Sequence, residues 1–227
     1  MSALDSSKYF PDPKVASFVD DVQQGDVNRV RAGLAMGIDP NALGNKGFRP
    51  INFVFFAKEA EVLRLLLAAG ANPNSPLENG DTPLHYSVRN RNPEFTRALL
   101  TAGANPNGRG ENGKPHIHEA ISQEDAAGQV KLLHDAGADI NVVWGGFTPV
   151  MRALWVGRWE IARVLIDLGA DLSFRDASGF TALDRACQFM NKIPVNRGNR
   201  EGISALVISL SRRNLSLPCQ ADVERFR

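Results

Sequence analysis

The sequence predicts an all-α protein built from stacked helix–turn–helix units. The first observation is a glycine every 33 residues, a period that indicates a repeat array. The second is a polar turn of the form Gly-Ala-Asn-Pro-Asn that keeps phase with these glycines. The third is that helix caps and helical apolar spacing lie between the two landmarks. The periodic glycines are Gly47, Gly80, Gly113, Gly146 and Gly179.

The segment Gly80–Asn107 shows each element of a unit most clearly. Thr82 is a favourable N-cap, and Pro83 suits the first helical position because its missing N–H costs nothing there. Pro93 should begin the second helix, whose apolar residues recur at helical spacing. Gly103 should end that helix in the left-handed conformation. Each unit therefore consists of two short helices and a connecting turn.

The motif Gly80-Asp81-Thr82-Pro83-Leu84-His85, followed by Gly103-Ala104-Asn105-Pro106-Asn107, resembles the ankyrin repeat at that family's period. The resemblance implies a solenoid of about six units, joined by short β-turn or hairpin loops around a concave groove. Some units depart from the motif: Arg49 and Pro115 stand where the family has threonine. Repeats that differ this much suggest a scaffold specialised for one partner.

The repeats imply a single domain over residues 1–227, because stacking buries each apolar face against the next unit. We expect tails at both chain ends to be loosely attached. The expected parts are an N-terminal tail 1–12, an N-cap unit 13–43, repeats 44–76, 77–109, 110–142 and 143–175, a C-cap unit 176–213 with an inserted loop at 191–201, and a C-terminal tail 214–227.

Composition limits the possible partners. The formal net charge is +1, so no overall attraction to nucleic acid is expected. The late basic residues favour a solvated cap over a nucleic-acid patch; they are Lys192, Arg197, Arg200, Arg212 and Arg213. No signal-peptide h-region or membrane-spanning run is present. We expect a cytoplasmic monomer, although export without such a signal remains open.

Two cysteines do not indicate a disulfide framework. Cys187 lies in a predicted helix, where a small buried apolar role is favoured. Cys219 lies in the expected C-terminal tail.

The segment Gly108–His118 contains motifs that suggest an enzyme. Gly108–Lys114 fits both a dinucleotide fingerprint and the start of a phosphate-binding loop. Both chemistries need a strand before the loop, whereas a helix and a turn precede it here. His116 and His118 lack zinc-site spacing, and His85 and His118 occupy the repeat's own histidine position, which the resemblance makes structural. A nucleotide- or metal-dependent enzyme at 108–118 is therefore the disfavoured alternative, and we expect no catalytic residue, cofactor or metal.

The resemblance places partner contacts on the turn tips and near the ends of the first helices. These positions are rich in large aromatic residues, which are unusual on a surface unless it binds a partner. Tryptophan and arginine are also the residues most enriched in interface hot spots. We expect the unit at Gly146 to be the main anchor. The alternative is that Phe48, Phe147 and Phe180 pack against neighbouring turns and are only partly exposed. The predicted contacts are Phe48, Phe56, Asp81, Arg89, Asn90, Lys114, Trp144, Phe147, Trp155 and Phe180.

The expected function is non-enzymatic binding of one protein partner in the groove. Binding would inhibit or sequester that partner. The chain resembles stand-alone bacterial ankyrin proteins, some of which are immunity proteins against a cognate toxin. Others are secreted effectors that bind host proteins, and this second role is the alternative. The resemblance is at the level of the fold and leaves the partner's identity open.

Overall fold

The computed structural model describes residues 4–57, 60–90, 92–123 and 126–226. Within these residues every regular element is a helix, and strand-like pairing is limited to the isolated bridges Arg109–Pro115 and Trp144–Phe147. The predicted all-α repeat fold is therefore confirmed. Contacts divide the chain into two compact units, Met1–His116 and Ile117–Arg227, and each is described by itself.

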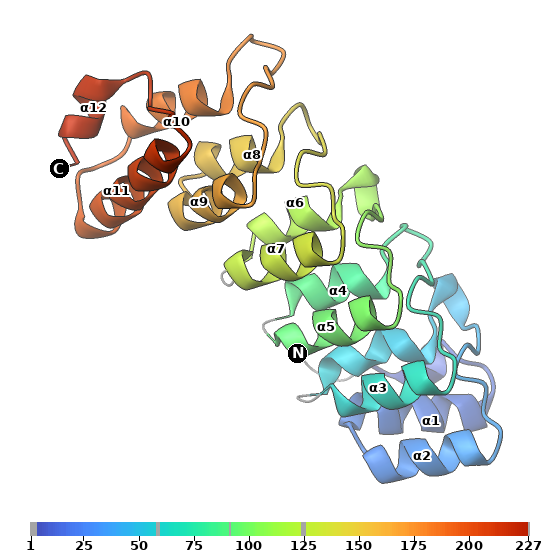
Figure 1. Cartoon of the computed structure of the whole chain (residues 1–227). Helices are drawn as coiled ribbons and strands as arrows, with labels where there is room; N and C mark the ends of the chain where they lie inside the picture. Colours follow the sequence, from blue (N-terminus) through green and yellow to red (C-terminus); the bar gives the residue numbers. More distant parts are fainter. Residues whose placement is uncertain (1–3, 58–59, 91, 124–125, 227) are drawn as a thin grey trace. The chain divides into compact units, whose positions relative to one another are not determined.

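The first unit is built from helix pairs in two layers. Its α-helices and 3-10 helices (η) are η1 (Ser6–Lys8), α1 (Pro13–Gln24), α2 (Val27–Ala35), η2 (Asn45–Gly47), η3 (Pro50–Phe56), α3 (Glu61–Ala68), α4 (Pro83–Arg89), α5 (Pro93–Thr101) and η4 (Glu111–Gly113). The first helices form one layer, in which η3 contacts both α1 and α4. The second helices form the other layer, in which α3 contacts both α2 and α5 (Figure 1).

The second unit repeats this arrangement. Its helices are α6 (His116–Ile121), α7 (Ala126–Asp135), α8 (Pro149–Trp155), α9 (Trp159–Asp167), α10 (Ala182–Met190), α11 (Arg197–Arg212) and α12 (Gln220–Glu224). The first helices α8 and α10 pack on each other, and α9 contacts α7 and α11 in the second layer. Equivalent residues of the consecutive first helices α8 and α10 therefore lie side by side.

Caps and turns explain why the helices begin and end where they do. The backbone N–H of Thr82 donates to Nδ1 of His85 at 3.0 Å, and Asn92 accepts the backbone N–H of Glu94 at 3.0 Å. The five periodic glycines all have positive φ, between 66° and 87°. Glycine adopts this region without steric cost, so the period marks one repeated turn geometry.

The core lies between the two layers. Phe53 and Phe95 are fully buried, and Trp159 is 5% exposed. Successive second helices contribute buried leucines such as Leu66 and Leu99. Burying such side chains provides the main stabilisation between consecutive repeats.

The tails differ from the expectation of loose attachment. At the N-terminal end Phe10 is buried, and the ring of Tyr9 lies 4.6 Å from that of Phe48. The backbone N–H of Asn45 also donates to the Tyr9 carbonyl at 2.8 Å. The N-terminal tail therefore packs against the first repeat through the buried Phe10 and the half-buried Tyr9.

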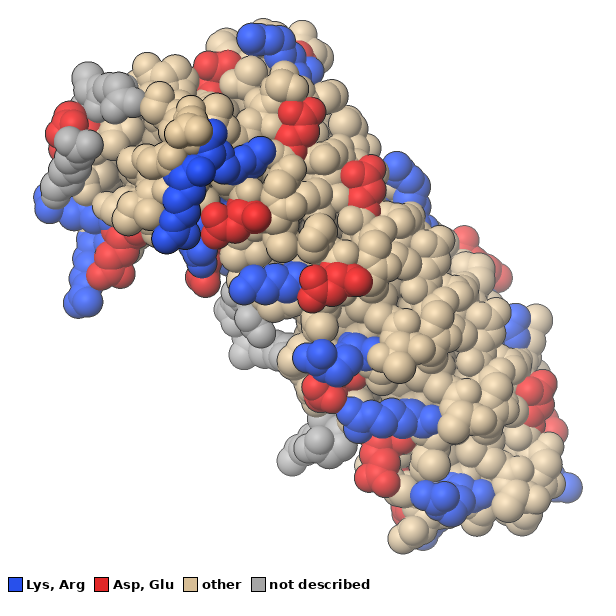
Figure 2. Space-filling model, viewed as in Figure 1, with Lys and Arg blue, Asp and Glu red and all other residues tan. Residues whose placement is uncertain are grey.

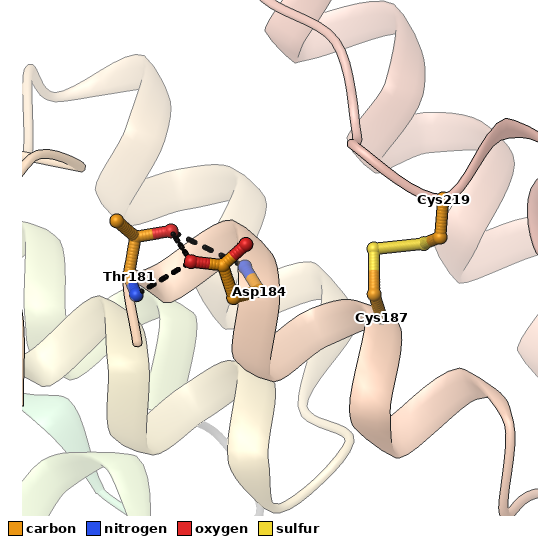
Figure 3. The surroundings of a disulfide bond; sticks show 4 residues. All are labelled: Thr181, Asp184, Cys187 and Cys219. Atoms are coloured by element: carbon orange, nitrogen blue, oxygen red, sulfur yellow. Dashed lines mark hydrogen bonds between the residues drawn. A yellow bond between two sulfur atoms is a disulfide. The ribbon is translucent and has the colours of Figure 1, made fainter. Parts of the chain in front are cut away.

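The C-terminal segment is held both covalently and by packing. Cys187 of α10 forms a disulfide with Cys219, just before α12, with a Cα–Cα distance of 5.8 Å (Figure 3). Leu217, Val223 and Phe226 are buried. The expectations of a loose tail and of no disulfide are therefore wrong, because the fold brings together two cysteines that lie 32 residues apart.

The inserted segment 191–201 is only partly a loop. α11 begins at Arg197, inside the segment for which the sequence predicts a loop. Asn196 caps it by accepting the backbone N–H of Asn199 at 2.9 Å. The Asn196 cap lies within the insertion, so α11 begins before the end of the expected loop.

Candidate functional site

A two-residue hairpin turn in the second unit holds two aromatic rings beside each other. Trp144 and Phe147 pair across it through backbone bonds of 3.0 Å and 3.2 Å. The intervening Gly145 and Gly146 have φ of 58° and 80°, the two positive values that such tight turns require. Paired residues across a hairpin project to the same face, so both rings flank the same space.

Arg152 of α8 occupies the space beside these rings. Its guanidinium carbon lies 5.5 Å from the Trp144 ring centroid and 5.1 Å from that of Phe147. Its Nε atom is buried and makes no hydrogen bond within the described residues. The two rings thus stabilise a cation by cation–π attraction, while the buried donor has no acceptor.

A second arginine joins the next repeat to the same group. Arg185 of α10 lies over Phe180 at 4.6 Å and over Trp155 at 5.1 Å. Trp155 itself stacks on Phe147 at a centroid distance of 6.2 Å. We name this group the aromatic–arginine cluster. It consists of Trp144, Phe147, Arg152, Trp155, Phe180 and Arg185.

Polar contacts fix Arg185 in place. Its Nε donates to Asp176 at 2.6 Å, and its Nη1 donates to Gln188 at 2.8 Å. Burial opposes ionisation of Asp176, but hydrogen bonds from Arg185 and from the backbone of Phe180 and Ser178 outweigh it and lower its pKa. The side chain of Arg185 is only 12% exposed, whereas Trp155 and Phe180 are each 37% exposed. Arg185, fixed by these contacts, thus supports the Trp155 and Phe180 rings, which remain partly exposed.

The structure brings together four of the predicted contacts, namely Trp144, Phe147, Trp155 and Phe180. Phe147 is half-buried, as the packing alternative anticipated, and Phe180 is more exposed. The prediction missed Arg152, Arg185 and Asp176. A usable signal was present, since Arg152 and Arg185 lie 33 residues apart and each follows a phenylalanine by five positions.

Two of the contacts predicted in the first unit are aromatic, Phe48 and Phe56. Phe48 is half-buried and packs on Tyr9 and Phe53. The ring centroids of Phe48 and Phe53 are 5.5 Å apart. Phe56 is partly exposed at the end of η3. The packing alternative therefore describes Phe48 well.

The charged contacts predicted in the first unit include one correction. Asp81 is 2% exposed, so the expectation that it faces a partner is wrong. Its carboxylate accepts from Arg89 at 3.0 Å and from the backbone N–H of Glu111 at 2.9 Å. Arg89 is exposed, whereas Asn90 and Lys114 are half-buried. Asp81 therefore orients Arg89 and joins consecutive turns.

The segment that suggested an enzyme forms a hairpin turn at a repeat junction. Gly110 donates its backbone N–H to the Lys114 carbonyl at 3.0 Å, and the next N–H is occupied by Asp81. His85 and His116 lie ring against ring at 3.8 Å, with nitrogens near backbone carbonyls. Among the described residues no group of three potential metal ligands occurs. This geometry stabilises the turn and differs from a phosphate-binding loop.

Comparison with protein families identifies the repeat. The model described as ankyrin repeats (3 copies) matches residues 21–110, 53–143 and 98–176, which together cover more than half of the chain. The chain belongs to the ankyrin repeat family.

Solved ankyrin repeat structures share this fold. A domain from Acinetobacter baumannii matches with TM-score 0.71 at 22% identity, over 85% of this chain and 97% of that one. A chain in the complex of a predatory endopeptidase from Bdellovibrio bacteriovorus with an immunity protein matches with TM-score 0.66 at 24% identity, over 83% and 95%. The ankyrin repeat domain of Bcl-3, of the IkappaB family, matches with TM-score 0.69 at 26% identity, over 85% of both chains.

Sequence relatives among curated proteins match shorter stretches. An ankyrin repeat protein of Rickettsia bellii is 40% identical over 67 residues, which is 29% of this chain. The transcription factor TOXE of Cochliobolus carbonum is 52% identical over 40 residues, which is 18% of this chain. The aligned stretches span only 39% and 9% of those relatives' own lengths. Within the part of this chain that the structure describes, every helix is too short or too polar to cross a bilayer.

Proposed function

We propose that this ankyrin repeat protein binds one protein partner, without catalysing a reaction, and that the aromatic–arginine cluster is the principal contact. Ankyrin repeats are protein–protein interaction modules. The observation that carries the proposal is the pair of partly exposed rings, Trp155 and Phe180, supported from below by Arg185. Tryptophan and arginine are enriched among the residues that dominate binding energy.

The support for this surface comes from its preorganisation. Arg185 is fixed by Asp176 and Gln188, so binding would order few additional side-chain rotamers. Rigid aromatic contacts reduce the entropic cost of association. The remaining predicted contacts, including Phe56, Arg89 and Lys114, stay predictions for a secondary contact.

We further propose that binding inhibits or sequesters the partner, as an immunity protein does to a toxin. The endopeptidase complex from Bdellovibrio bacteriovorus contains an immunity protein, and this likeness motivates the idea. A repeat array can inhibit a partner simply by covering the surface that it binds. If the partner is an enzyme, one molar equivalent of this protein should abolish its activity.

The test is affinity capture from the source organism, followed by identification and titration of the captured protein. Trp155→Ala should raise the dissociation constant by roughly 30-fold, as expected for a hot spot worth about 2 kcal/mol. Ile208→Ala is the matched control, because Ile208 is also an exposed apolar residue but lies on α11, outside the cluster. Equal loss in both variants, or no loss in either, would contradict the assignment of the surface.

A further inference from the structure

The two arginines of the aromatic–arginine cluster differ in their hydrogen-bond partners. Arg185 has a carboxylate partner in Asp176, whereas no acceptor lies within hydrogen-bond distance of the Arg152 Nε atom in the described residues. A guanidinium has five N–H donors in a planar fork. The buried Nε cannot be reached from outside, but Arg152 as a whole is partly exposed. A ligand would therefore bind its terminal Nη1 and Nη2 groups, which can donate to one anion.

The surroundings of Arg152 shape this site. The Trp144 and Phe147 rings confine the guanidinium, and a Cβ added at Gly145 would lie 3.4 Å from its Nη2. The hairpin backbone can therefore lie close to the Arg152 guanidinium because Gly145 has no Cβ. Aromatic rings weaken competition from water for the charged group, which strengthens an ion pair formed beside them.

The charge around the cluster favours an anion. Lys192 places its Nζ 6.0 Å from the Trp155 ring centroid. The carboxylates nearby are occupied: Asp176 pairs with Arg185, and Asp184 accepts from the Thr181 backbone at 2.9 Å (Figure 3). Three cations, Arg152, Arg185 and Lys192, stand against the two carboxylates Asp176 and Asp184, which leaves one net positive charge.

We infer that Arg152 is the receptor for a carboxylate on the protein partner, an Asp or Glu side chain flanked by an apolar residue that packs on Trp155 and Phe180. This inference rests on the proposed function and specifies its chemistry. Arginine binds carboxylates through paired N–H···O bonds, which give both strength and orientation. The apolar neighbour follows from the two partly exposed rings beside the cation.

A nucleic acid would present phosphates and bases to the same groups, but the charges favour protein. The net charge is +1, and the face drawn in Figure 2 has acidic and basic side chains interspersed without a continuous basic stripe. Nucleic-acid affinity depends on many phosphate contacts. One arginine between two rings is better suited to a single carboxylate.

Selection from a displayed random peptide library tests the inference. Peptides that bind the wild-type protein and are lost with Trp155→Ala should share an acidic residue next to an apolar one. Arg152→Gln should weaken a selected synthetic peptide by roughly tenfold to a hundredfold. Changing the peptide's Glu to Gln should cost a similar factor on the wild type and little on Arg152→Gln. The wild-type measurement alone still tests the need for the carboxylate if Arg152→Gln folds poorly.

The outcomes separate the two proposals. Trp155-dependent peptides without an acidic preference would overturn the role of Arg152 and leave the interaction surface intact. A library without any Trp155-dependent peptide would overturn both. Tighter, Arg152-dependent retention of a single-stranded oligonucleotide than of the acidic peptide would overturn the carboxylate assignment. Lys131→Gln, on α7, is the control for loss of a positive charge outside the cluster.

Discussion

The side-chain oxygen of Asn74 accepts the backbone N–H of Asn105 at 2.7 Å, and the Asn74 amide donates to the Gly103 carbonyl at 3.0 Å. Asn41 makes the same pair of bonds to Asn72 and Gly70 one repeat earlier. The asparagine of the polar turn thus fixes the register between consecutive repeats.

Removing the hydrogen bonds of Asn74 to Asn105 and Gly103 should lower the stability of the first unit. Asn74→Ala should lower the free energy of unfolding by about 1–2 kcal/mol, because two backbone groups lose their partner. Asn74→Asp should cost less, since its oxygen can still accept from Asn105. Urea unfolding followed by circular dichroism measures both, and equal stability of Asn74→Ala and wild type would show that the bonds contribute nothing.

The two tryptophans Trp155 and Trp159 should respond differently to truncation. Trp159 is 5% exposed, and its Nε1 donates to Asn199 at 3.4 Å. Trp159→Ala should therefore cost about 3–5 kcal/mol through cavity formation. Trp155→Ala removes a side chain that is 37% exposed, and the change should stay within about 1 kcal/mol. A collapse of the melting temperature in Trp155→Ala would mean that this residue belongs to the core.

The disulfide should stabilise the C-terminal end. Cys187→Ser combined with Cys219→Ser should lower the free energy of unfolding by about 2–4 kcal/mol. Hydrogen exchange should increase at residues 214–226 while the helices of the first unit remain protected. A reductant should lower the melting temperature of wild type and leave the double variant unchanged; equal shifts in the two would contradict a role for the bond.

Acid should weaken the first unit through Asp81. Burial opposes its ionisation, but hydrogen bonds from the Glu111 backbone and from Arg89 outweigh it and lower its pKa. The folded pKa thus lies below the unfolded value near 3.9. The stabilisation is complete above the unfolded pKa and is lost as pH falls through the folded pKa.

Asp81→Asn isolates this contribution. The variant should be less stable at neutral pH, and the difference from wild type should shrink as pH falls below about 4. Urea unfolding midpoints between about pH 2 and pH 6 measure it. A difference that stays constant across this range would show that the charge of Asp81 is not responsible.

Local chemistry made much of the fold predictable. The positive φ at Gly80 and Gly103, the cap at Thr82 and the helix start at Pro93 all follow from intrinsic backbone preferences. The compartment and the oligomeric state stay predictions, because they depend on more than a repeat pattern.

Longer-range geometry explains what was missed. Asp81 is buried because Gly110 of the next turn has no Cβ, and a Cβ there would collide with the carboxylate. The bond between Cys187 and Cys219 depends on where α12 returns along α10. Arg152 and Arg185 had a periodic signal, but only the fold shows that they share one set of rings.

The aromatic–arginine cluster takes its side chains from two consecutive helix pairs, and Phe147 lies near both arginines, at 5.1 Å and 6.0 Å. Neither of these two repeats can therefore be exchanged alone without losing part of the surface. New specificity would require coordinated changes in neighbouring repeats. A library for redesign should vary Trp155 and Phe180 together while retaining Arg185, Asp176 and Gln188 as the fixed support.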